Sequence, residues 1–136
     1  MQIELTNKEF RRLLDLVYIG NWVLNSTRGK DRFQDYDKIE SKLFGKCQEC
    51  GMGTLTEDWN GTKIPSKAYT EGGIHEAIAY YEDNIFYEIL AEELSRRDME
   101  YPDITEENYD EIISRMDQYL DEFQTYGLDN LTLEDS

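Results

Sequence analysis

Histidine, cysteine and proline are scarce in this sequence, which has one histidine, two cysteines and two prolines among 136 residues. A single histidine excludes the zinc-protease helix and the Glu-x-x-His pairs of di-metal helical bundles, since both need two histidines. Two cysteines without a secretory signal favour free thiols in a reducing compartment over a structural disulfide. Histidine-rich metal sites and disulfide frameworks are therefore not expected.

Long apolar runs and cofactor motifs are also missing. No stretch approaches the ~20 apolar residues of a membrane-spanning helix, and the N-terminus lacks the basic and apolar segments of a secretory signal. Neither a Gly-x-Gly-x-x-Gly sequence nor a phosphate-binding loop occurs. We therefore expect a cytoplasmic protein with no cofactor, no membrane contact and no recognisable catalytic constellation.

Positive charge is missing from one half of the chain. Residues 1–67 hold 11 Lys/Arg and 10 Asp/Glu, whereas residues 68–136 hold 3 Lys/Arg and 20 Asp/Glu, and the net charge is −16. A strongly negative field disfavours direct binding to nucleic acid or anionic lipid and favours a basic protein partner.

Helical patterns cover most of the chain. Apolar residues recur at helical spacing from Thr6 to Leu24, from Tyr36 to Cys50, from Gly73 to Asp98 and after Thr105 as far as Gly127. Thr6 and Glu9 fit a capping box at the first start, and Gly127 fits the last end. The sequence predicts an all-α single domain over residues 1–136, an antiparallel bundle of about four helices.

The first helix is apolar on nearly every side, because only Asp15 and Asn21 are strongly polar between Leu13 and Leu24. Such a helix must be covered on nearly every side. Two interpretations follow: it is the central helix of the domain, or it forms a homodimer interface through residues 10–24.

The segment 51–73 has no helical period and is long for a connection inside a domain. It contains Asn60-Gly61, which favours a tight turn between Leu55–Trp59 and Thr62–Ile64. We expect a small β-hairpin near residues 54–64.

Cys47, Cys50 and His75 are the weak candidates for metal binding or enzymatic chemistry. Two cysteines three residues apart chelate zinc when a turn directs both sulfurs inward, and His75 is the only side chain that titrates near neutrality unperturbed. Both cysteines also continue the apolar stripe of Tyr36, Ile39 and Leu43, as small buried side chains do. Core cysteines are the favoured interpretation.

Aromatic and acidic side chains provide the candidate partner-binding residues. Aromatic rings are common anchors at protein interfaces, and carboxylates attract a basic partner. The candidates are Trp59, Tyr80, Tyr87, Asp110, Glu111, Asp117 and Asp121. We predict a small acidic helical protein that acts through its surface in protein–protein interaction or regulation. The alternatives are a nucleic-acid mimic that inhibits a DNA-binding protein, and the metal or enzymatic site above.

Overall fold

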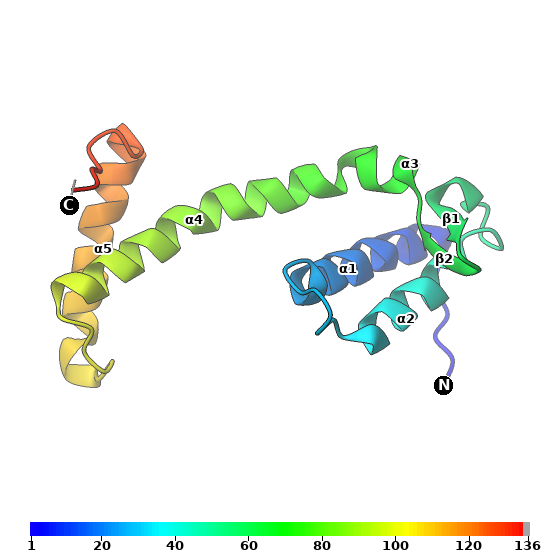
Figure 1. Cartoon of the computed structure of the whole chain (residues 1–136), viewed down its shortest axis with the longest axis horizontal. Helices are drawn as coiled ribbons and strands as arrows, with labels where there is room; N and C mark the ends of the chain where they lie inside the picture. Colours follow the sequence, from blue (N-terminus) through cyan, green and yellow to red (C-terminus); the bar gives the residue numbers. More distant parts are fainter. Residues whose placement is uncertain (135–136) are drawn as a thin grey trace. The chain divides into compact units, whose positions relative to one another are not determined.

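The computed structural model describes residues 1–134 and is mostly helical, with four helices of 11 to 24 residues and one small sheet (Figure 1). The elements in chain order are α1 (Asn7–Asn25), α2 (Gln34–Phe44), the 3-10 turn η1 (Gly53–Leu55), β1 (Thr56–Trp59), β2 (Thr62–Pro65), α3 (Lys67–Tyr69), the π-helical turn η2 (Thr70–Ile74), α4 (His75–Asp98) and α5 (Glu106–Tyr126). The predicted helical fold with a hairpin is confirmed, whereas the antiparallel bundle stays a prediction.

The chain divides into two compact units, Met1–Ile78 (unit 1) and Ala79–Ser136 (unit 2). Residues 1–78 hold 11 Lys/Arg and 12 Asp/Glu, whereas residues 79–136 hold 3 Lys/Arg and 18 Asp/Glu. Almost the whole net negative charge of the chain therefore belongs to unit 2. A single domain over residues 1–136 stays a prediction, and each unit is described by itself below.

Helix α1 begins with the predicted capping box. The Glu9 amide donates to the Thr6 hydroxyl at 3.1 Å, and the Thr6 amide donates to the Glu9 carboxylate at 3.0 Å. Within unit 1, α1 buries Phe10 and Leu14 but leaves Leu16 70 % exposed. The central-helix interpretation and the homodimer through residues 10–24 both stay predictions.

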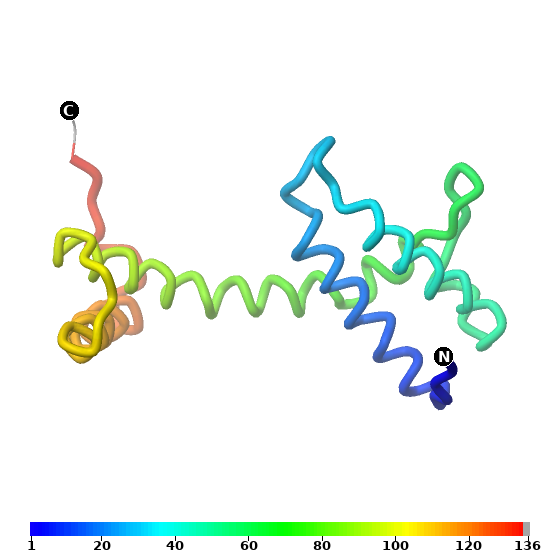
Figure 2. The backbone as a smooth tube through the Cα atoms, turned by 90° about the horizontal axis from the view of Figure 1, so that it is seen from below, coloured from blue at the N-terminus to red at the C-terminus, as the bar shows by residue number. Residues whose placement is uncertain are grey.

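The core of unit 1 lies where α1 and α2, side by side in both backbone views, meet the segment after the hairpin (Figures 1 and 2). The Tyr69 ring packs edge-on against Phe44 and Tyr18, with ring centroids 5.0 and 5.3 Å apart. Its hydroxyl donates to the Asp15 carboxylate at 2.8 Å. The buried members of this core are Phe10, Leu14, Phe44, Cys47 and Tyr69.

Helix α2 is shorter than predicted and turned about its axis. It ends at Phe44 instead of Cys50, and residues 45–51 continue as tight turns. Ile39, expected in the apolar stripe, is exposed, whereas Phe44 is fully buried. Hydrogen bonds explain this rotation of α2, because Asn21 of α1 donates to Asp37 and Glu40 and these two residues therefore face α1.

The predicted hairpin is confirmed. Strands β1 and β2 pair antiparallel, with Thr56 opposite Pro65 and Trp59 opposite Thr62. Asn60 and Gly61 have φ values of 50° and 77°. Positive φ at both central residues is the requirement of the type I′ turn, which matches the twist of paired strands.

Helix α4 begins at a bend that positions His75. Gly73 has a φ of 113°, a conformation that a side chain would strain. Ser66 holds the preceding turn, because its hydroxyl donates to the Thr54 carbonyl at 2.6 Å and accepts the Tyr69 amide at 3.2 Å.

In unit 2, α4 packs against α5 through few buried side chains. The Phe123 ring lies between Tyr87 and Tyr119, at centroid distances of 5.5 and 6.1 Å, and the Tyr119 hydroxyl donates to Asp98. Thr105 caps α5 as predicted, and Gly127 ends it with a φ of 58°. The buried residues of this contact are Ala91, Ser95, Ile112 and Phe123.

Among residues 1–134, no helix combines the length and the apolar character needed to cross a membrane.

Candidate functional site

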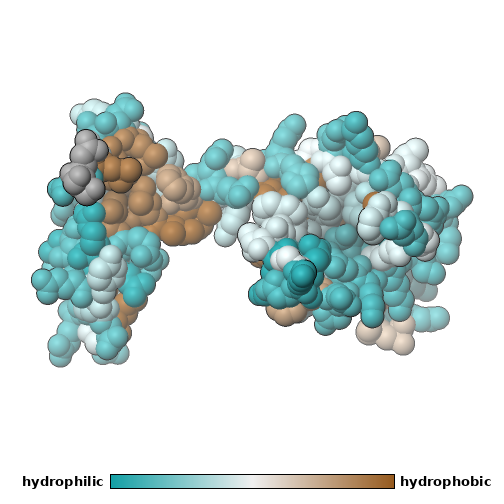
Figure 3. All heavy atoms as spheres, in the orientation of Figure 1, coloured by the Kyte–Doolittle hydropathy of each residue, from teal (hydrophilic) through white to brown (hydrophobic). Residues whose placement is uncertain are grey.

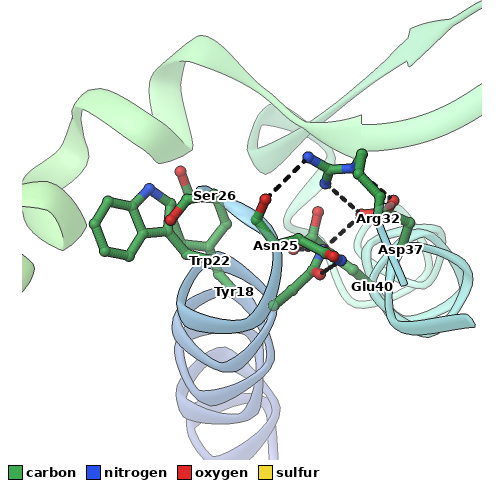
Figure 4. Close-up of a pocket in the computed structure, with 8 residues that line it drawn as sticks. Tyr18, Trp22, Asn25, Ser26, Arg32, Asp37 and Glu40 are labelled. Carbon is green, nitrogen blue, oxygen red and sulfur yellow. Dashed lines mark hydrogen bonds and ion pairs between the residues drawn. The ribbon is translucent and has the colours of Figure 1, made fainter. Parts of the chain in front are cut away.

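A polar pocket with a volume of about 180 Å³ lies in unit 1 between the C-terminal half of α1 and the start of α2 (Figure 4). It is smaller than the ~300–1,000 Å³ typical of sites for drug-sized ligands, so it suits a small group. Its lining comes from both helices and the loop that joins them: Tyr18, Asn21, Trp22, Asn25, Ser26, Arg32, Asp37 and Glu40.

Two buried asparagines form the floor of the pocket. The Asn25 side-chain amide donates to Asn21 Oδ1 at 2.7 Å and to the Phe33 carbonyl at 3.1 Å, and its oxygen accepts the Phe33 amide at 2.8 Å. Asn21 Nδ2 donates in turn to Asp37 and Glu40, each at 3.0 Å. Every one of these side-chain groups has a partner, as buried polar groups require.

The charges of the pocket are not balanced. Arg32 donates from Nε and Nη2 to the two oxygens of Asp37 at 3.1 and 2.9 Å, and these hydrogen bonds lower the pKa of Asp37. Among the residues that the structure describes, the half-buried Glu40 accepts a hydrogen bond from the Asn21 amide alone, and burial raises the pKa of its carboxyl group. Glu40 therefore carries the residual negative charge.

Aromatic rings form the opposite wall. Tyr18 Oη and His75 Nε2 share a hydrogen bond of 2.6 Å, and the imidazole also lies edge-on to Trp22 at a centroid distance of 6.1 Å. Burial raises the pKa of the Tyr18 hydroxyl. The histidine therefore holds Tyr18 and Trp22 beside the pocket.

Cys47 and Cys50 lie in the turns after α2 as free thiols. Cys47 is fully buried in the core of unit 1, and burial raises the pKa of its thiol, which opposes formation of the reactive thiolate. In the described part of the chain, no group of three or more His, Cys, Asp or Glu side chains is arranged to hold a metal ion. The structure does not bring Cys47, Cys50 and His75 together as ligands.

The predicted partner-binding residues lie in different places. Trp59 ends β1 in unit 1, and Tyr80 is 74 % exposed on α4 in unit 2. Tyr87 packs against Phe123, so it belongs to the contact between α4 and α5. The acidic candidates are all exposed along α5: Asp110, Glu111, Asp117 and Asp121.

Helix α4 has a second apolar side, which the sequence analysis did not identify as a candidate binding surface. Tyr81, Ile85 and Ile89, which belong to the apolar pattern that predicts a helix from Gly73 to Asp98, recur every four residues, with Phe86 beside them. Tyr87 is two residues from both Ile85 and Ile89, which places it on nearly the opposite side of the helix, and it faces α5. Ile89 is 53 % exposed. We call Tyr81, Ile85, Phe86 and Ile89 the apolar ridge, and Figure 3 shows apolar surface gathered on unit 2.

The pocket residues were also missed, although a signal for them existed. Asn21 and Asn25 are polar positions in an otherwise apolar helix, and a buried amide there needs a partner from another element. The sequence did not reveal that the partners are Asp37, Glu40 and the backbone of Phe33.

We expect Glu40→Gln to raise the free energy of unfolding of the protein near pH 7. Since burial raises the Glu40 pKa, the folded state binds that proton more tightly than the unfolded state. The resulting stabilisation is complete below the unfolded pKa of about 4.3 and is lost as the pH rises through the folded pKa. Glutamine keeps an acceptor for Asn21 and removes the charge. The free energy of unfolding of the variant should therefore rise relative to that of the wild type between pH 4 and pH 7. Urea denaturation followed by circular dichroism measures this. Glu57→Gln, an exposed change on β1, is the control, and an equal gain there would contradict the explanation.

No protein-family model matches the sequence, and comparison with the curated proteins and with the solved structures finds no match.

Proposed function

We propose that this protein is an acidic interaction module whose unit 2 binds a basic, amphipathic helical segment of a protein partner. The observation that carries the proposal is the apolar ridge, which lies on the most acidic part of the chain. Its row Tyr81–Ile85–Ile89 lies on the side of α4 away from Tyr87 and α5, and Phe86 borders this row and packs edge-on against Tyr87. Exposed apolar patches bordered by polar side chains commonly mark interaction sites.

The ridge has the shape of one half of a helix–helix contact. Residues four apart on a helix form a continuous row, and Tyr81, Ile85 and Ile89 form such a row over about 12 Å. Carboxylates surround the row: Glu82 lies along one side, Glu88 and Glu92 lie along the other, and Glu93, four residues after Ile89, lies at its C-terminal end. A partner helix with an apolar stripe flanked by lysine or arginine complements this pattern.

Charge favours a basic partner over a second copy on this face. Residues 79–136 hold 18 acidic and 3 basic side chains. Two copies of the ridge brought together would place these like charges at short range, whereas a basic segment gains attraction. The homodimer through residues 10–24 remains a separate proposal for unit 1, which is nearly neutral and exposes Leu16 and Val23 on α1.

The carboxylates on the exposed face of α5 extend the negative field of unit 2. Asp110, Asp117 and Asp121 form no ion pair among the described residues, whereas Glu111 pairs with Arg115 at 3.1 Å. Unpaired surface charges accelerate the encounter of oppositely charged partners more than they strengthen the final complex. In this proposal they steer the partner and the apolar ridge retains it.

Binding of a lysine–leucine amphipathic peptide of about 18 residues tests the proposal, with fluorescence anisotropy at low and high salt as the readout. Replacing both Phe86 and Ile89 by serine should weaken binding by about tenfold or more, because each side chain loses ~1.5–3 kcal/mol of burial when fully covered. Leu16→Ser, at an exposed apolar position in unit 1, is the control and should leave binding unchanged.

The charge contribution is measured separately by stopped-flow kinetics. Replacing Asp110, Asp117 and Asp121 by asparagine should slow association severalfold and leave dissociation unchanged. Equal binding of a peptide with the same composition but no apolar stripe would overturn the role of the ridge. Loss of binding with the α5 variant alone, together with competition by DNA for a basic protein, would support the nucleic-acid-mimic alternative instead.

A further inference from the structure

Glu40 is the one charge of the unit 1 pocket that has no ion pair among the described residues, because Arg32 acts on it only at longer range. The nearest cationic side chain of the pocket, Arg32, is engaged by both oxygens of Asp37 and by the Asn25 carbonyl at 3.5 Å. Asn21 gives Glu40 one neutral hydrogen bond, to Oε2. A half-buried carboxylate with one neutral donor is incompletely compensated, and a cation is the partner that such a group binds most strongly.

The wall beside Glu40 suits an organic cation. Tyr18 and Trp22 lie one turn apart on α1, and His75 holds both rings through the hydrogen bond to Tyr18 and the edge contact with Trp22. The faces of tyrosine and tryptophan attract ammonium and guanidinium groups, most strongly where water is partly excluded. The Ser26 hydroxyl at the same opening adds a hydrogen-bond acceptor (Figure 4).

The size of the pocket restricts the ligand to a small group. Its volume of about 180 Å³ corresponds to roughly six water molecules at ~30 Å³ each. A guanidinium or ammonium group with a few carbon atoms fits this space, whereas a nucleotide does not. Inorganic cations are less suitable, because they need several oxygen ligands, and no such group occurs among the described residues.

We propose that this pocket binds the guanidinium or primary ammonium head of a small organic cation, with Glu40 as its counter-ion and Trp22 and Tyr18 as its aromatic walls. The same chemistry is offered by a free diamine or guanidine compound and by an arginine or lysine side chain of a protein. This site lies in unit 1 and uses none of the residues through which unit 2 is proposed to bind its partner.

Nuclear magnetic resonance provides a direct readout, because the chain has two tryptophans, Trp22 in the pocket and Trp59 on the hairpin. Titration of the full chain with agmatine, a free guanidine compound, and with acetyl-arginine amide, a model of a protein side chain, should shift the indole N–H signal of Trp22. The Trp59 signal is the internal reference and should stay in place. Tighter binding of agmatine would assign the natural ligand to small molecules, and tighter binding of the arginine amide would assign it to a protein side chain.

Two variants make the test decisive. Glu40→Gln keeps the volume and the acceptor for Asn21, and it should weaken binding of both probes at least tenfold, since charge-assisted hydrogen bonds are roughly twice as strong as neutral ones. Glu57→Gln removes an exposed carboxylate of unit 1 and should change nothing. A Trp22 signal that does not move with either probe overturns the proposal. Unchanged affinity in Glu40→Gln, or a parallel shift of Trp59, does the same.

Discussion

Replacing Asn25 by alanine is expected to lower the free energy of unfolding by about 2–4 kcal/mol, a large part of the ~5–15 kcal/mol that stabilises a typical domain. The Asn25 side chain is 1 % exposed and makes three hydrogen bonds, two of them to the backbone of Phe33. Alanine leaves the Phe33 amide and carbonyl and the Asn21 oxygen without these partners. Each buried group that loses its partner costs ~1–3 kcal/mol, less where water enters.

Chemical denaturation followed by circular dichroism measures the effect. Asn84→Ala is the matched control, because Asn84 makes one hydrogen bond, to the Tyr80 carbonyl, from an exposed position on α4. Its stability should differ little from that of the wild type. Asn25→Asp is a second variant: it keeps the acceptor for the Phe33 amide, loses both donors and should destabilise at least as much as alanine at pH 7. A wild-type midpoint for either Asn25 variant would contradict the structural role.

The same substitution connects stability with the pocket. Asn25 fixes Asn21, and Asn21 is the only described side chain that donates to Glu40. If the amide pair is lost, the carboxylate of Glu40 loses its fixed position between the two helices. A pocket built on buried amides is therefore sensitive to changes in residues that do not touch the ligand.

Local signals in the sequence were sufficient for several elements. Thr6 and Glu9 begin α1, Asn60-Gly61 turns the hairpin, and Thr105 and Gly127 bound α5. Each signal acts through hydrogen bonds or backbone angles within a few residues, so no tertiary contact is needed to read it.

The contacts that assemble the pocket and the core of unit 1 could not be predicted from local signals in the sequence. The hydrogen bond between Tyr18 and His75 joins residues 57 apart in the sequence, and the bond between Tyr69 and Asp15 joins residues 54 apart. The rotation of α2 likewise depends on Asn21 of another helix, which turns Glu40 inward and leaves Ile39 outside. Periodicity indicates that a helix is amphipathic, but polar partners decide which side faces the core.

Helix α4 shows a further limit of periodicity. Its apolar residues lie on two sides, the ridge on one and Tyr87, Ala91 and Leu94 on the other, and helical spacing alone does not say which side is covered. Only the contact of Tyr87 with Phe123 identifies the side that is covered. The helical spacing therefore identified the apolar residues of α4 but not which of them are covered.

Replacing Phe123 by alanine is expected to produce the largest loss of structure in unit 2. Deleting a buried phenylalanine costs ~3–5 kcal/mol, and Phe123 is one of four buried residues in the contact between α4 and α5. Its ring is also the one that touches both Tyr87 and Tyr119. Since most of the stability of a helix in a protein comes from its tertiary packing, α5 should lose most of its helical structure once this contact is removed.

Hydrogen exchange resolved by residue tests this expectation, because it separates the two units within the intact chain. In Phe123→Ala the amides of residues 106–126 should lose protection, whereas those of α1 should keep it. Tyr126→Ala removes an exposed ring from the last turn of the same helix and is the matched control. Protection of α5 that survives Phe123→Ala would mean that other contacts hold the helix. Loss of protection confined to α5, with α4 still helical, would leave the ridge available, and the amphipathic peptide should then still bind.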